Sequence, residues 1–89
     1  MPTQTLEIVN RKGLHARASA KFVETVEAFD ASARVSRDGQ TVGGDSIMGL
    51  LMLAAHRGSH IEVSVEGAEA DQLLSALSEL VSTGFGESD

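Results

Sequence analysis

The chain has 89 residues, 42% of them hydrophobic, which suffices for one modest core and places residues 1–89 in a single domain. It contains no cysteine, which excludes a disulfide framework and a thiolate metal site. The formal net charge of −6 argues against nucleic acid as the main partner. No apolar run is long enough to cross a bilayer, and the first residues lack the apolar core of a secretion signal. We therefore expect no membrane insertion and a cytoplasmic location.

The first part of the chain predicts a strand and a helix. Leu6 and Ile8 occupy alternate positions, which predicts a half-buried strand over residues 3–9, followed by a turn that ends at Gly13. Apolar residues then recur at helical spacing over 16–29, which predicts an amphipathic helix.

A hairpin is predicted next. A strand over 32–37 leads into Asp38-Gly39, a strong two-residue turn signal, and then into a short strand over 40–42. Gly43-Gly44 interrupts that strand.

The last part predicts two helices around a strand. Residues 47–55 form a dense apolar run that predicts a short helix ended by Gly58. Residues 60–66 alternate as a half-buried strand does, and residues 70–81 carry the clearest helical stripe, with Gly84 at its end.

This order of elements predicts the fold class. Each strand has one apolar face, so one face of the sheet is left to water and all three helices must cover the other. We expect an α+β fold, an open-faced two-layer sandwich with a four-stranded antiparallel sheet and three helices on one face. The tail from Gly86 to Asp89 is expected to be loose.

Positive charge is concentrated in one short segment. Arg11, Lys12, Arg17 and Lys21 lie close together with no acidic residue between them, whereas no Lys or Arg follows Arg57. Such a patch attracts an anion or an acidic partner surface, although ordinary solvated charge would look the same in sequence.

The chemistry points to His15, which stands where the first helix begins. That position favours Ser, Thr, Asp or Asn, so His is a poor capping choice and a broken local rule indicates a site. The backbone N–H groups of Ala16, Arg17 and Ala18 would lack helical partners there and would form an anion site. The Arg17 guanidinium suits phosphate oxygens.

A neutral imidazole in this setting is a nucleophile toward phosphorus. The positive helix end disfavours the imidazolium and stabilises a dianionic phosphoryl group, so His15 could both accept and donate that group. A solvent-facing loop histidine without a role remains the alternative.

Two segments resemble the two motifs of the HPr family, the small phosphocarriers of the phosphoenolpyruvate-dependent phosphotransferase system. They are Gly13 to Val23, which contains His15, and Asp45 to Ala54. The resemblance implies phosphorylation of His15 on its δ1 nitrogen by enzyme I, assistance from Arg17, and donation to enzyme IIA proteins. These serve sugar transport or a nitrogen-related branch. It implies a stoichiometric carrier rather than an enzyme.

One position departs from the family pattern, because Ala18 stands where the family usually has proline. We predict that the helix survives, since alanine is an excellent helix former, and that Ala18 contributes one more N–H to the phosphate. The expected loss is some rigidity at the helix start.

Two roles are expected for Ser46. In many relatives the matching serine is a target of an HPr kinase/phosphorylase, so regulatory phosphorylation is implied. Serine before a helix is also an ordinary N-cap, for which Asp45 is another candidate, and both roles are compatible.

The second helix is too apolar to bury every side chain against one sheet face. We expect Ile47, Met48 and Leu51 to remain exposed and, with Lys12 and Lys21, to dock partner proteins onto a monomer. A helix buried entirely in the core is the alternative.

Other candidate sites are weaker. His56 is expected to offset a helix dipole and His60 to be exposed, and neither has metal-ligand spacing with His15, so we expect neither a metal nor a cofactor. Ser19 lies near His15 without the third member that a hydrolase needs. The other functions left open are a regulatory relative acting through Ser46 and a small-molecule-binding α+β module.

Overall fold

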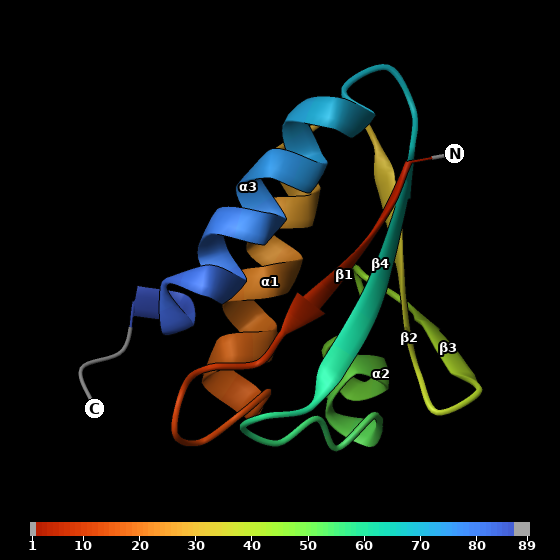
Figure 1. The fold of residues 1–89 in the computed structure, drawn as a ribbon. Helices are drawn as coiled ribbons and strands as arrows, with labels where there is room; N and C mark the ends of the chain where they lie inside the picture. The colour runs from red at the N-terminus through yellow and green to blue at the C-terminus, as the bar shows by residue number, and fades with distance from the viewer. Residues whose placement is uncertain (1, 87–89) are drawn as a thin grey trace.

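The computed structural model describes residues 2–86. The described chain forms eight elements, and its strands and α-helices build two layers (Figure 1). The elements are β1 (Thr3–Glu7), α1 (Ala16–Glu27), β2 (Ser32–Arg37), β3 (Gln40–Gly43), α2 (Ile47–Met52), β4 (His60–Glu66), α3 (Ala70–Ser82) and η1 (Gly84–Gly86), a 3₁₀ turn. No helix in this described part combines the length and the apolarity that crossing a membrane requires.

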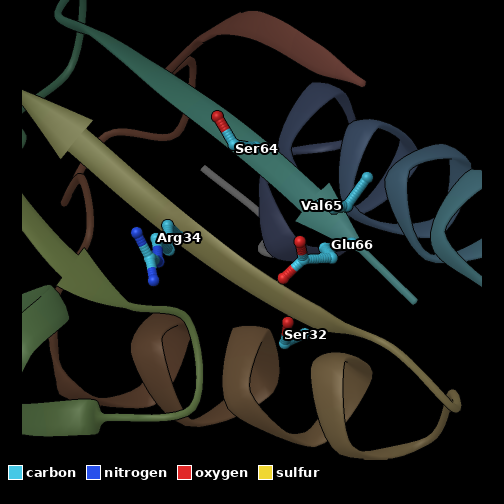
Figure 2. Close-up of a pocket in the computed structure, with 5 residues that line it drawn as sticks. All are labelled: Ser32, Arg34, Ser64, Val65 and Glu66. Carbon is cyan, nitrogen blue, oxygen red and sulfur yellow. The ribbon is translucent and has the colours of Figure 1, made fainter. Parts of the chain in front are cut away.

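The four strands form one antiparallel sheet in the order β1-β4-β2-β3. The three α-helices lie on the same face of the sheet, so the predicted open-faced sandwich is confirmed (Figure 1). The other face is polar, because the strands alternate. Residues from β2 and β4, among them Arg34 and Glu66, line a pocket of about 80 Å³. Figure 2 shows the residues that line it.

The core lies between the sheet and the helices and is aliphatic apart from two phenylalanines. Strand β4 supplies alternate buried positions, as the sequence predicts for a half-buried strand. Helix α3 supplies one buried stripe, and α1 supplies a second that includes Phe22. The largest side chains with less than 2% exposure are Phe22, Phe85, Ile8, Leu50, Leu53, Ile61, Leu73, Leu77, Val35, Val63, Val65 and Val81.

Helix α2 is shorter than predicted. It ends at Met52 rather than at residue 55, and Gly58 lies well beyond its end. The cause is Ala54, whose backbone turns to φ +53°, a left-handed conformation that a helix cannot continue through. The residues after it run as a loop against the start of the chain.

Other boundaries also differ from the sequence prediction. Strand β3 continues through Gly43, which pairs with Arg34 instead of interrupting the strand, and α3 ends at Ser82, one residue later than predicted. Helix α1 ends at Glu27 and β1 at Glu7, two residues before the predicted ends in each case. Gly86, expected to begin a loose tail, instead belongs to η1. Residues 87–89 of that tail lie outside the described part of the chain.

Candidate functional site

His15 is the N-cap of α1, and its own ring makes the capping contact. Its backbone is extended (φ −80°, ψ −177°), and Nδ1 accepts a hydrogen bond from the Arg17 backbone N–H at 3.2 Å. The His15 carbonyl accepts the first helical bond, from the Ser19 N–H at 2.8 Å. Histidine is not among the preferred capping residues, yet its ring makes the capping bond here. The imidazole replaces the usual side-chain oxygen, and its Nδ1 lone pair faces the mouth of the helix.

A tight turn holds His15 in this place. The Asn10 side-chain amide is buried and donates to the Gly13 carbonyl at 2.8 Å, while the Gly13 N–H donates to the Asn10 carbonyl at 3.1 Å. Gly13 has φ +67°, and a Cβ there would lie 2.5 Å from the Ala55 carbonyl oxygen. Leu14 follows with its N–H bonded to that same oxygen at 2.8 Å. Only glycine fits at residue 13. The hydrogen bonds of Gly13 and Leu14 fix the backbone that leads into His15.

The residues that follow His15 differ in their exposure to solvent. His15 is half-buried, Ala16 and Arg17 are exposed, and Ala18 and Ser19 are buried at 0% exposure. The Ser19 hydroxyl donates to the Leu14 carbonyl at 3.4 Å and not to the His15 ring. The arrangement provides no support for a Ser–His hydrolase pair. It leaves a half-buried imidazole beside the N–H groups of a helix start, a place that can hold an anion.

The predicted docking cations have different environments. Lys12 is exposed, as the docking prediction requires. Lys21, in contrast, is half-buried, and its Nζ donates to the Phe85 carbonyl at 2.7 Å. Phe85 is buried in a left-handed conformation, φ +59°. Lys21 therefore connects α1 to η1, the turn that follows α3, a structural role that the local sequence did not indicate.

Ser46 is the N-cap of α2. Its Oγ accepts from the Gly49 N–H at 3.0 Å, so Ser46 rather than the exposed Asp45 provides the cap. A Cβ on Gly49 would lie 3.0 Å from the Val42 Cβ and 3.2 Å from Ser46 Oγ, which explains glycine inside this helix. The hydroxyl lies at the start of the helix that carries the exposed Ile47 and Met48.

The exposed side chains of α2 form an apolar patch. Met48 is 69% exposed and Ile47 is 40% exposed, whereas Leu51 is half-buried. Met52, which the sequence analysis did not select, is 68% exposed. Met52 follows Met48 by four residues, and this spacing places both on one helix face. Because α2 packs beside α1, the apolar patch lies next to the histidine-bearing helix.

The two other histidines do not assemble a metal site. His60 is exposed at the start of β4, opposite Glu7 of β1. His56 is exposed and lies four residues beyond the end of α2, too far to offset the dipole of its last turn as predicted. Residues 2–86 hold no group of three His, Asp or Glu side chains arranged for a metal ion.

The chain is similar to known proteins over its whole length. The family model described as "PTS HPr component phosphorylation site" matches residues 2–83. The Phosphocarrier protein HPr of Neisseria meningitidis is 44% identical over 89 residues, covering all of both chains. The Phosphocarrier protein NPr of Escherichia coli is 38% identical over 85 residues, covering 94% of each.

Solved structures give the same result. The crystal structure of HPr-C-His from Thermoanaerobacter tengcongensis matches with a TM-score of 0.94 and 37% identity, over the whole of both chains. A structure described as an HPr dimer from the same organism matches with a TM-score of 0.77 and 38% identity, over 98% of this chain and all of that one. Sequence and fold agree, and the chain belongs to the HPr family of phosphocarrier proteins of the phosphotransferase system.

Proposed function

We propose that His15 is the phosphoryl carrier of this protein, accepting the group from enzyme I on Nδ1 and passing it to enzyme IIA proteins. The observation that carries the proposal is the hydrogen bond from the Arg17 N–H to Nδ1 at 3.2 Å. A nitrogen that accepts a hydrogen bond presents a lone pair, and here that lone pair lies at the positive end of a twelve-residue helix.

The transfer step follows from this geometry. The Nδ1 lone pair forms a bond to phosphorus while the bond between phosphorus and the donor breaks, and its electron pair leaves with the donor. As the new bond forms, Nδ1 no longer accepts from Arg17, whose N–H is then available to a phosphoryl oxygen. The site exchanges one acceptor for another without moving the helix. Donation to an acceptor nucleophile is the same step in reverse.

Arg17 and the first helical turn stabilise the transferred group. Arg17 is exposed, so its guanidinium can approach the phosphoryl oxygens from the solvent side. The backbone N–H groups of Ala16, Arg17 and Ala18 belong to the first turn, where N–H groups have no partner four residues back. These groups would bind a phosphoryl group without enclosing it, which suits a carrier that must also release it.

Partner proteins dock on α1 and α2 in this proposal. Met48 and Ile47 provide exposed apolar contact area, and Lys12 adds positive charge beside the turn that carries His15. A monomer that meets enzyme I and enzyme IIA in turn within the cytoplasm would expose this surface at all times. A dimer is described for one relative, and we propose the monomer as the active form here.

The docking proposal predicts a large effect of Met48→Asp. The side chain is 69% exposed, so the substitution should leave the unfolding free energy nearly unchanged. A charge placed in an apolar contact should weaken association with enzyme I by about tenfold or more. Titration of enzyme I with the variant measures this, and Met48→Leu is the matched control. Unchanged affinity of the aspartate variant would contradict the proposed docking surface.

Regulation through Ser46 is a second part of the proposal. The hydroxyl is half-buried and engaged as a helix cap, and a phosphate there would also lie at a helix N-terminus. It would add negative charge beside the apolar patch and disfavour an acidic donor. Incubation with purified HPr kinase/phosphorylase and ATP should modify wild type and leave Ser46→Ala unmodified. Unmodified wild type would remove this part of the proposal.

The carrier function is tested by mixing the protein with enzyme I and phosphoenolpyruvate and measuring its intact mass. Wild type should gain one acid-labile phosphoryl group, and addition of an enzyme IIA protein should remove it. His15→Ala should gain none, while His56→Ala and His60→Ala should behave as wild type. Phosphorylation that persists in His15→Ala would overturn the assignment.

A further inference from the structure

The loop between α2 and β4 is fixed against the turn that precedes His15. The Ala55 carbonyl accepts from the Leu14 N–H at 2.8 Å, and the Gly58 N–H donates to the Ile8 carbonyl at 2.8 Å. The Ile8 N–H in turn donates to the Ser59 carbonyl at 2.9 Å. In Figure 1 these two connections lie side by side at the same end of the molecule as the start of α1.

The contact between the two connections is close. A Cβ on Gly13 would lie 2.9 Å from the Cα of His56, so the backbones touch with no side chain between them. Ala54 enters the loop in its left-handed conformation, which directs the chain toward this contact. Arg57 lies between the two bonded residues His56 and Gly58 and is exposed. Its position along the turn is therefore set by backbone hydrogen bonds rather than by its own side chain.

The fold thereby joins two segments that contain no acidic residue. They are residues 8–23, which carry His15, and residues 46–61, which carry Arg57. All 13 Asp and Glu residues of the chain lie outside them. The two segments hold every Lys and Arg of the chain except Arg34 and Arg37. In a protein of net charge −6, these two joined segments thus carry five of the seven Lys and Arg residues and no acidic one.

We propose that Arg57 is a docking residue for the proteins that exchange the phosphoryl group with His15, contacting an acidic surface on them. With Arg11, Lys12 and Arg17 it forms a basic rim around the start of α1. Arg57 approaches this rim from the loop side, and Arg17 approaches it from the helix side. It supplies the positive charge that Lys21 cannot present freely, because the Lys21 ammonium is bonded to the Phe85 carbonyl.

This inference rests on the proposed carrier function and specifies the charge of its partners. Exposed charges at an interface act mainly on the rate of association, and their effect decreases with ionic strength. Arg57 does not contact the reacting nitrogen in this proposal. Its removal should therefore raise the KM for transfer and leave kcat unchanged.

The test compares Arg57→Gln with Arg34→Gln. Arg34 is exposed on the open face of the sheet, away from α1, so both variants lose one exposed positive charge (Figure 2). Phosphoryl transfer from enzyme I and to an enzyme IIA protein is measured at low and high salt. Arg57→Gln should raise the KM for the donor, the acceptor or both by about fivefold at low salt. The difference should shrink at high salt, and Arg34→Gln and Arg57→Lys should remain within about twofold of wild type.

Equilibrium binding of the unphosphorylated protein to enzyme I separates this inference from the carrier function, because it needs no transfer. Weaker binding of Arg57→Gln, with no phosphorylation of wild-type His15, would keep the basic rim and reject the carrier proposal. Phosphorylation of His15 with Arg57→Gln and Arg34→Gln indistinguishable toward both partners would reject the role of Arg57. A change in kcat alone, with KM unchanged, would also reject a docking role.

Discussion

The two capped helices of this protein start alike and differ in what surrounds them. His15 caps α1 through Nδ1, bonded to the N–H two residues on, and Ser46 caps α2 through Oγ, bonded to the N–H three residues on. Both are half-buried, and phosphorylation is proposed for both side chains. One cap stands at a helix of twelve residues and the other at a helix of six.

The difference lies in charge and in capping strength. A phosphate on His15 would meet Arg17 and no acidic residue within seven positions on either side, whereas a phosphate on Ser46 would have Asp45 as its neighbour. Serine is among the preferred caps and histidine is not. The same local geometry thus provides a favourable site for a group in transit at α1 and an ordinary stabilising cap at α2. Substitutions can test each half of this contrast.

The largest expected effect is that of His15→Asn. Asparagine is a good N-cap, so α1 should keep its start and the unfolding free energy should not fall. Phosphoryl transfer should nevertheless be lost completely, because asparagine has no nucleophilic ring nitrogen. Chemical denaturation and intact mass after incubation with enzyme I and phosphoenolpyruvate measure the two properties. A variant that is both unfolded and inactive would mean that the ring is mainly structural.

Ser46→Ala should give the reverse pattern. Removing the acceptor of the Gly49 N–H should lower the unfolding free energy by about 1 kcal/mol, with transfer through His15 preserved. Ser46→Asp is the matched control, since a carboxylate can still cap, and it should retain most of the lost stability. Equal destabilisation by both variants in urea titrations would show that the cap contact contributes little.

The end of α2 offers a smaller effect. Ala54 adopts φ +53°, a conformation that favours glycine, whereas Ala28, the C-cap of α1, has φ −78°. Ala54→Gly should therefore raise the unfolding free energy by about 0.5 kcal/mol, since relief of strain exceeds the added flexibility of the unfolded chain. Ala28→Gly should lower it by a similar amount, because Ala28 is unstrained. Thermal unfolding of both variants decides the comparison.

The smallest effect is expected from Ala18→Pro. Ala18 lies in the first turn of α1, where proline fits the helix and removes an N–H that has no helical partner. The rate of transfer should change by no more than about threefold in either direction. A hundredfold rise would mean that the native site lacks the competence proposed for it.

The sequence predicted the sandwich and both capped positions because these follow from local patterns. The alternation in β4 and the apolar stripe of α3 can each be recognised from the residues of that element alone. The two family motifs are likewise continuous in sequence. The early end of α2 was not predictable, since alanine at residue 54 gives no signal of a left-handed backbone.

Contacts between residues far apart in the sequence were also not predicted. The bond from Lys21 to the Phe85 carbonyl spans 64 positions, and no local pattern indicates it. The approach of Gly13 to His56 likewise depends on the whole sheet being formed. The exposure of Met52 could have been predicted from the sequence, because its spacing from Met48 places both on one face of α2.

The most direct test of the central claim is to identify which nitrogen of His15 carries the phosphoryl group. Nitrogen-15-labelled protein is phosphorylated with enzyme I and phosphoenolpyruvate, and coupling between nitrogen and phosphorus is measured by NMR. The geometry predicts a phosphorus bond to Nδ1 and a large shift of the Arg17 amide, whose hydrogen bond to that nitrogen is replaced. A phosphorus bond to Nε2, or an Arg17 amide that does not respond, would contradict the account.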